Sequence, residues 1–119
     1  MDNSTFYTNY QRGLLPLVIL SLLKREDMYG YQLVQQTERT SQGKLSTREG
    51  SLYPVLYKLE ESGFISSRRV LAGKRMTRVY YHIEPVGLEY LDALIKEYKT
   101  VTTGMFLIIR GQEDKDEAK

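Results

Sequence analysis

The sequence contains no cysteine, no tryptophan and only one histidine, His82, among its 119 residues. Without cysteine, disulfide bonds and thiolate metal sites are excluded, and a lone histidine argues against a histidine-based metal site. We therefore expect no metal and no cofactor, and we interpret His82 as structural. The sequence also shows no nucleophile–base pairing, no phosphate-cradling glycine loop and no metal-ligand cluster, so we do not expect an enzyme.

Features that direct a protein to a membrane are also lacking. The polar N-terminus does not look like a signal peptide, and Pro16 interrupts the apolar run Leu14–Leu23. That run is too short for a membrane span, which needs about 20 apolar residues. The hydrophobic fraction of 41% supports one small core, and a core of this size often depends on oligomerisation. We expect a soluble cytoplasmic protein that does not contact a membrane.

Apolar residues recur at helical spacing in the first half of the chain, which predicts helices over residues 12–25, 28–40 and 46–63. The first is apolar on nearly all sides, which indicates burial on more than one face. Its spacing continues into residues 1–11 and leaves two interpretations, a frayed terminus or an N-terminal helical extension. In the third helix, Ser46 and Glu49 have capping-box spacing, and Gly63 occupies the position after the last turn.

Two segments rich in β-branched and aromatic residues, Phe64–Leu71 and Met76–Ile83, predict a β-hairpin with a turn at Ala72–Arg75. Lys44–Ser46 is a candidate third strand. Alternation of side chains along the second strand sets its inward face. The inward residues are Val79, Tyr81 and Ile83.

The predicted hairpin is strongly basic, although the net charge of the whole chain is only +2. No acidic residue occurs between Ser62 and Glu84, whereas five basic residues do: Arg68, Arg69, Lys74, Arg75 and Arg78. A helix-turn-helix followed by such a ribbon suits a DNA duplex. The second helix can enter the major groove, and the ribbon can contact phosphates or the minor groove.

The last third of the chain predicts one long helix. Pro85 fits its first position, and apolar residues then repeat at close to 3.5 residues as far as Ile109. A helix over Pro85–Ile109 is a rod of about 37 Å, too long for its far half to pack on so small a domain. We interpret the apolar stripe as the seam of a homodimer. The alternative is a helix that folds back on its own domain.

The predicted fold is therefore α+β but mainly α: a winged helix-turn-helix domain with a long C-terminal dimerisation helix. We place the winged-helix domain, with its N-terminal helical extension, at residues 1–83 and the dimerisation helix at residues 84–110. Gly111 ends this helix, and the charged tail over residues 111–119 is expected to be disordered.

The sequence resembles the PadR-type regulators, a family named for the phenolic acid decarboxylase repressor. Over about residues 10–99, the resemblance is carried by Gly13–Leu23, Tyr29–Leu33, Glu49–Glu60, Gly63–Ile65 and Arg78–Tyr81. The segment Glu49–Glu60 is similar to the recognition-helix signature of the family. Two departures are Glu84–Pro85, where a threonine or aspartate cap is more usual, and the unusually apolar run Met105–Ile109.

This resemblance implies a bacterial winged-helix repressor of the compact subfamily, which dimerises through its first and last helices. We expect it to bind an inverted-repeat operator in double-stranded DNA as a homodimer. Many members leave DNA when a small aromatic or drug-like ligand binds. A competing hypothesis is a winged-helix adaptor that binds other proteins without sequence-specific DNA contact.

Two sets of candidate site residues follow. For DNA contact, we expect the opening of the second helix, the recognition helix and the hairpin turn to contribute Tyr29, Gln32, Arg48, Ser51, Tyr53, Lys58, Lys74 and Arg75. For a planar hydrophobic effector, an aromatic lining with an adaptable methionine is suitable. That lining would comprise Tyr7, Tyr10, Leu14, Tyr98, Met105 and Phe106, which alternatively pack the dimer interface.

Overall fold

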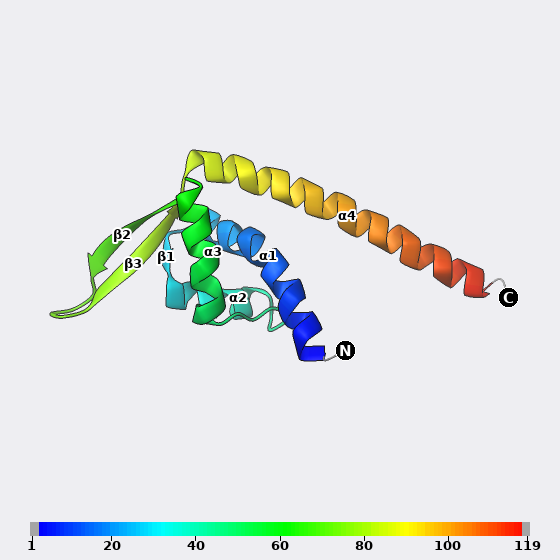
Figure 1. Cartoon of the computed structure of the whole chain (residues 1–119), viewed down its shortest axis with the longest axis horizontal. Helices are drawn as coiled ribbons and strands as arrows, with labels where there is room; N and C mark the ends of the chain where they lie inside the picture. Colours follow the sequence, from blue (N-terminus) through cyan, green and yellow to red (C-terminus); the bar gives the residue numbers. More distant parts are fainter. Residues whose placement is uncertain (1–2, 118–119) are drawn as a thin grey trace.

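Three helices form a compact body from which a β-hairpin and a long C-terminal helix project in different directions (Figure 1). This computed structural model describes the backbone of residues 3–117 and the side chains of residues 13–111. The elements in chain order are α1 (Asn3–Arg25), β1 (Met28–Tyr29), α2 (Gly30–Thr40), α3 (Glu49–Glu61), β2 (Ile65–Leu71), β3 (Thr77–Ile83) and α4 (Pro85–Glu117). The strands form an antiparallel sheet in the order β1-β3-β2. The predicted winged helix-turn-helix is confirmed.

The core lies where α1, α2 and α3 meet the inner face of the sheet. Ile19 and Leu20 of α1, Leu33 of α2 and Leu52 of α3 are almost completely buried. Leu91, in the second turn of α4, closes the core from the side of the C-terminal helix. Burying each such side chain contributes roughly 1.5–3 kcal/mol to folding, so these residues fix how α3 is presented.

The two ends of α3 differ from each other in how well the sequence predicted them. Gly63 has a φ of 80°, and its N–H donates to the carbonyl of Glu60, as expected for the residue that follows a helix. The capping box of Ser46 and Glu49 is wrong, because Arg48 is the N-cap residue and Glu49 is the first residue of the helix. A capping box requires the glutamate at the third helical position.

The third strand of the sheet is not where the sequence suggested. Met28 and Tyr29 form β1 and pair with Tyr81 and Tyr80 of β3, so the predicted helix over residues 28–40 begins only at Gly30. The candidate strand Lys44–Ser46 is wrong, since that segment has no regular secondary structure. A two-residue strand is too short to show an alternation of apolar and polar residues. The sequence therefore assigns its residues to the helix that follows.

The hairpin has the predicted position and orientation. β2 and β3 pair from Ile65 opposite Ile83 to Leu71 opposite Thr77. Tyr81 and Ile83 are buried against the helices, as alternation predicted. Ser67 lies on the same inner face, because its Oγ donates a hydrogen bond to Oε1 of Glu60 on α3.

The start of α4 is tied closely to the hairpin. Pro85 is its first residue, as predicted, and Phe64 stacks on Tyr90 with ring centroids 4.2 Å apart. A Cβ on Gly87 would lie 2.1 Å from the carbonyl oxygen of Phe64, so only glycine allows this approach.

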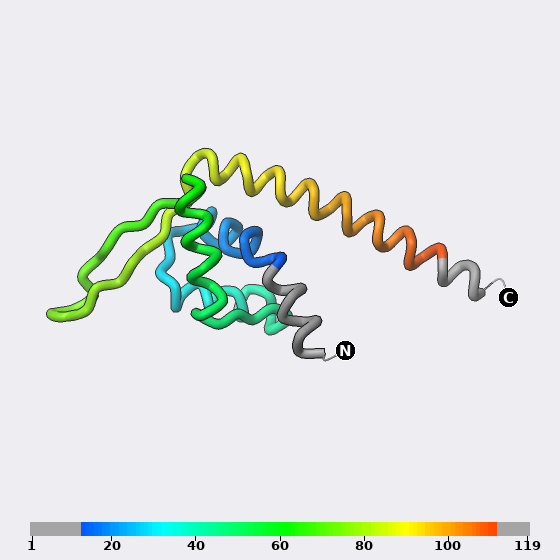
Figure 2. The backbone as a smooth tube through the Cα atoms, in the orientation of Figure 1, coloured from blue at the N-terminus to red at the C-terminus, as the bar shows by residue number. Residues whose placement is uncertain are grey.

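Beyond its first turns, α4 leaves the body (Figure 2), and the molecule extends over 70 Å. The predicted end of the helix at Gly111 is wrong, because α4 continues to Glu117. The disorder expected for residues 111–119 stays a prediction. A single glycine costs about 1 kcal/mol in a helix, which is not enough to terminate it. Residues 118–119 lie outside the described backbone. Within that backbone, none of the helices combines the length and apolarity that a membrane span requires.

Candidate nucleic-acid interface

The first two turns of α3 present several of the predicted DNA-binding residues to solvent. Arg48 precedes the helix in an extended conformation and is exposed. Its carbonyl oxygen accepts hydrogen bonds of 3.0 Å from the N–H groups of Ser51 and Leu52, which fixes the first turn. Ser51 is partly buried, and Tyr53 is 45% exposed. This end of the helix therefore exposes a guanidinium and a phenol and leaves a hydroxyl partly exposed.

Tyr53 also contacts the start of α2. A Cβ on Gly30 would lie 2.5 Å from the Tyr53 hydroxyl oxygen, so the tyrosine ring rests against the glycine. Beneath it, burial raises the pKa of the Tyr81 hydroxyl, and the neighbouring Tyr53 and Glu60 add to the effect. The Tyr81 hydroxyl therefore stays neutral at physiological pH. These contacts hold the Tyr53 ring against the start of α2, with its hydroxyl next to Gly30.

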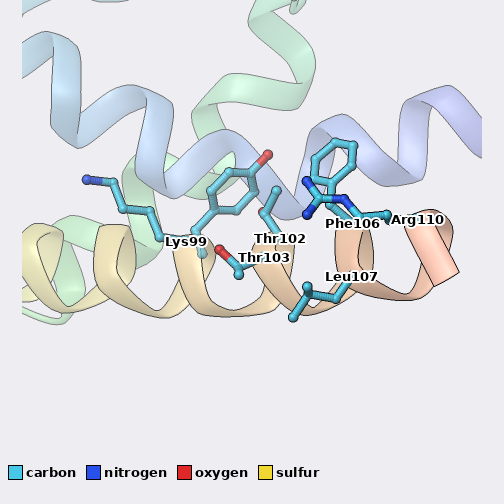
Figure 3. A pocket seen from close by; sticks show the side chains of 7 residues that line it. Lys99, Thr102, Thr103, Phe106, Leu107 and Arg110 are labelled. Atoms are coloured by element: carbon cyan, nitrogen blue, oxygen red, sulfur yellow. The ribbon is translucent and has the colours of Figure 1, made fainter.

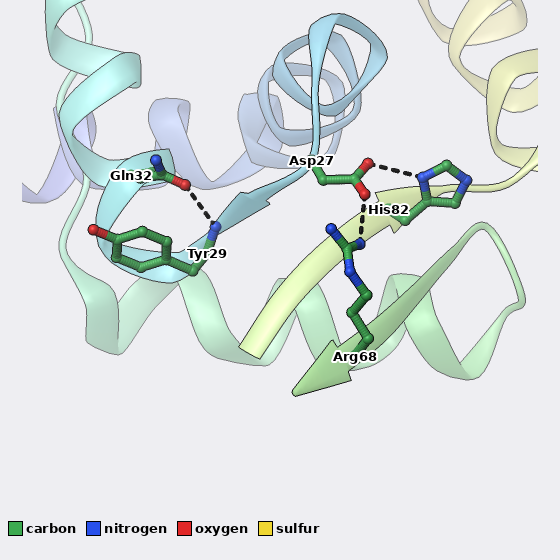
Figure 4. Close-up of polar contacts among 5 residues, drawn as sticks. All are labelled: Asp27, Tyr29, Gln32, Arg68 and His82. Atoms are coloured by element: carbon green, nitrogen blue, oxygen red, sulfur yellow. Dashed lines mark hydrogen bonds and ion pairs between the residues drawn. The ribbon is translucent and has the colours of Figure 1, made fainter. Parts of the chain in front are cut away.

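Tyr29 and Gln32 occupy the opening of α2, but both side chains have partners within the protein. The N–H of Tyr29 donates to Oε1 of Gln32 at 3.1 Å (Figure 4). The Tyr29 ring lies edge-on to Tyr80 at 5.3 Å, and the guanidinium of Arg78 lies 4.6 Å from the Tyr29 ring centroid. Both residues are only partly buried.

Asp27 joins the hairpin to the end of α1. Its Oδ1 lies 2.8 Å from Nδ1 of His82, and its Oδ2 accepts a hydrogen bond from Arg68 (Figure 4). Burial acts to raise the pKa of Asp27, but hydrogen bonds and charge attraction from His82 and Arg68 outweigh it and lower that pKa. Arg68 also lies 5.4 Å from the centre of the Tyr80 ring. Two of the five hairpin cations, Arg68 and Arg78, thus have partners within the protein.

The turn of the hairpin carries the remaining predicted contacts. Lys74 and Arg75 are exposed, and among residues 13–111 no ion pair involves either of them. Gly73 has a φ of 145°, a conformation that side-chain-bearing residues rarely adopt, and it shapes the turn. Two cations at the tip of the hairpin are therefore available to bind phosphate.

Lys58 is separated from the other candidates. It lies in the last turn of α3, about 15 Å along the helix axis from Arg48 at 1.5 Å per residue. Glu60 and Glu61 are exposed in the same part of the helix. Because carboxylates repel phosphate, Lys58 is the weakest of the predicted DNA contacts.

The sequence did not predict the side-chain contacts that position the hairpin and α3. It assigned no role to Asp27, because its partners lie 41 and 55 residues away along the chain. The contact between Gly30 and Tyr53 was also missed. The hydrophobic pattern carries no signal for a partner so distant in sequence.

The residues predicted to line an effector site fall in two separate hollows. Leu14 and Tyr98 line a cavity of about 340 Å³ between α1 and α4. Tyr98 and Phe106 line a more open groove of about 490 Å³ along α4, whose wall includes Lys99 and Arg110 (Figure 3). Met105 lines neither hollow. Tyr7 and Tyr10 lie outside the residues whose side chains are described.

Comparison with known proteins agrees with this architecture. Residues 19–93 match the family described as "Transcriptional regulator PadR-like family". The structure of a PadR family transcriptional regulator from Eggerthella lenta DSM 2243 aligns with a TM-score of 0.78 at 27% identity, over 89% of this chain and 90% of that chain.

Two further comparisons concern one relative, PadR from Bacillus subtilis. The negative transcriptional regulator PadR of strain 168 is 29% identical over 84 residues, which are 70% of this chain and 46% of that protein. The structure of Bacillus subtilis PadR in complex with operator DNA aligns with a TM-score of 0.65 at 26% identity, over 69% of this chain and 46% of that chain. This chain thus spans about half of that relative. Because the family match extends over more than half of its length, the protein belongs to the PadR-like family of transcriptional regulators.

Proposed function

We propose that this protein is a transcriptional repressor that binds double-stranded DNA through the first half of α3 and the tip of the hairpin. The observation that carries the proposal is the placement of these two features. In Figure 1 the first turns of α3 lie at the lower edge of the body, and the hairpin projects to the left and slopes down to about the same level; its tip bears Lys74 and Arg75. The complex of Bacillus subtilis PadR with operator DNA supports the same use of the fold.

In this proposal the two features have different tasks. The exposed end of α3 enters the major groove, where Arg48 meets base edges and the hydroxyls of Ser51 and Tyr53 donate to phosphates. Lys74 and Arg75 neutralise phosphates from the hairpin side. Each phosphate that is neutralised steepens the dependence of log K on log salt by roughly 0.9.

We further propose that the protein acts as a homodimer joined through α4. The outer half of this helix exposes an apolar stripe that includes Tyr98, Val101 and Met105, followed by Ile108, which is 76% exposed. So large an exposed apolar surface is typical of an interface. A two-fold dimer would present two copies of α3 to an inverted repeat, with half-sites about 10 bp apart or a multiple of that.

A small effector is the final part of the proposal. Leu14 and Tyr98 line the cavity between α1 and α4, so a planar hydrophobic ligand bound there would alter the angle at which α4 leaves the body. A change of that angle in a dimer moves the two copies of α3 relative to each other, which would release the operator.

Selection from a pool of random duplexes tests the proposed function directly. The full chain should enrich an inverted repeat, and footprinting should protect both half-sites. Enrichment of no common sequence would contradict the proposal and would favour the adaptor hypothesis, in which the same fold binds another protein.

A further inference from the structure

The tip of the hairpin carries large apolar side chains that the described part of the chain does not cover. Leu71, at the end of β2, is 78% exposed, and Met76, just before β3, is 58% exposed. We propose that Leu71 enters the minor groove of DNA as an apolar wedge. This inference rests on the proposed function and assigns a specific role to a residue that it leaves unused.

The outer part of the hairpin is narrow enough for such a contact. β1 pairs only with Tyr80 and Tyr81, so the sheet has two strands rather than three from Val79 outward. The minor groove of B-form DNA is about 6 Å wide, so it admits a side chain that projects from the tip of the hairpin but not the body of a sheet. In Figure 1 the tip extends beyond β1 and beyond the helices.

Leu71 lies on the side of the hairpin that faces α3. The hydrogen bond from Ser67 to Glu60 identifies this side on β2. Because side chains alternate along a strand, Arg69 and Leu71 share the face of Ser67. A duplex that contacts the first half of α3 would therefore meet Leu71 rather than the opposite face, which Arg68 and Tyr80 occupy.

The charges around Leu71 favour DNA over an apolar protein surface. Lys74 and Arg75 lie in the turn between Leu71 and Met76, and no acidic residue occurs between Ser62 and Glu84. The minor groove has walls of deoxyribose and rims of phosphate. An apolar side chain flanked by cations matches both of these features.

A wedge of this kind would add sequence preference without hydrogen bonds to bases. An apolar side chain pressed into the minor groove partly unstacks a base step and kinks the duplex. Flexible pyrimidine–purine steps unstack most easily, and the amino group of guanine obstructs the groove. We therefore expect an A·T-rich, flexible step where the hairpin tip meets each half-site.

The test uses the full chain and the duplex that it selects from random DNA. The base 2-aminopurine, whose fluorescence rises when it is unstacked, replaces one adenine at a time in the flank that the hairpin protects. Wild-type protein should raise the fluorescence at one step in each half-site. The variant Leu71→Ser should abolish this rise and weaken binding roughly tenfold, because apolar contact is lost.

Two matched variants separate the wedge from general damage. Val86→Ser removes an apolar side chain that is 51% exposed in the first turn of α4, and it should leave both the fluorescence and the affinity unchanged. Lys74→Ala should reduce the salt dependence of log K by roughly 0.9 while the fluorescence rise remains.

Equal affinity and an equal fluorescence rise for Leu71→Ser and the wild type would overturn the wedge, and would assign the apolar tip to a protein partner. Failure of the wild-type chain to select any duplex would instead refute the proposed function itself. The two failures are therefore distinguishable.

Discussion

The hydroxyl of Tyr53 on α3 rests against the backbone of Gly30 at the start of α2, where a Cβ would lie only 2.5 Å from the hydroxyl oxygen. This contact links the two helices of the helix-turn-helix at the surface proposed to meet DNA. It also makes the position of one proposed phosphate donor depend on the absence of a side chain on the other helix.

Gly30→Ala should therefore weaken operator binding while leaving the fold intact. The new Cβ meets the end of a side chain that can move outward, so we expect a stability change below about 1 kcal/mol. The displaced Tyr53 hydroxyl should lose its phosphate, which lowers affinity roughly fivefold. Fluorescence anisotropy with the selected duplex measures the affinity, and Tyr53→Phe gives the loss due to the hydroxyl alone. Undiminished affinity in both variants would remove Tyr53 from the interface.

Gly87→Ala, unlike Gly30→Ala, should lower the stability of the fold strongly. The added Cβ would lie 2.1 Å from the Phe64 carbonyl oxygen and 2.9 Å from the side chain of Ile83. Since backbone cannot yield as a side chain does, we expect a loss of roughly 2–3 kcal/mol. Chemical denaturation monitored by circular dichroism measures it. Gly111→Ala is the control, because no atom lies within 4 Å of its Cβ and its stability should stay within about 0.5 kcal/mol.

Asp27→Asn should loosen the hairpin in a pH-dependent manner. The pKa of Asp27 is lower in the folded protein than its ordinary value of 3.8, so its contribution to stability is present above that value. The contribution is then lost as the pH falls through the lowered pKa. At neutral pH we expect the variant to be less stable by about 0.5–1 kcal/mol, since Arg68 and His82 are half exposed.

Denaturation of both proteins from pH 7 down to strongly acidic conditions measures this difference, which should shrink below about pH 4. Asp92→Asn removes an exposed i,i+4 pair with Lys96 at 3.1 Å and should cost no more than about 0.5 kcal/mol. A difference between wild type and Asp27→Asn that persists unchanged in acid would show that the charge of Asp27 is not what stabilises the hairpin.

Ile108→Asp should dissociate the proposed dimer without unfolding the monomer. Ile108 is 76% exposed in the single chain, so a charge there costs the monomer little. In a dimer seam the same carboxylate would be buried without a partner, which should raise the dimer dissociation constant roughly 100-fold or more. Analytical ultracentrifugation measures it. Ala93→Asp places the same charge on α4 away from the apolar stripe, and an equal effect of the two substitutions would contradict the proposed seam.

Local signals predicted the parts of the fold that local physics determines. Gly63 was correctly placed after α3, because a left-handed residue at that position favours glycine. Pro85 was correctly placed at the start of α4, where its missing N–H costs nothing. The two long strands were predicted to within one residue at each end, since β-branched residues and the glycine-containing turn mark them.

The remaining errors come from contacts that are distant in sequence or very short. β1 is formed by two residues whose pairing with Tyr80 and Tyr81 has no local signature. Arg68 is one of the five basic residues of the hairpin, yet Asp27, just after α1, forms an ion pair with it. The basic character of the hairpin was evident from composition, but which cations are available could be known only from the fold.

The central claim is that the first half of α3 and the hairpin tip together hold specific DNA. Its most direct measurement is a titration of the selected duplex and of a scrambled duplex at about 50 and 200 mM salt. We predict that the selected duplex binds at least about 1,000-fold more tightly at the higher salt, and that both Tyr53→Ala and Lys74→Ala weaken this binding. Equal affinity for the two duplexes, or wild-type affinity in both variants, would contradict the claim.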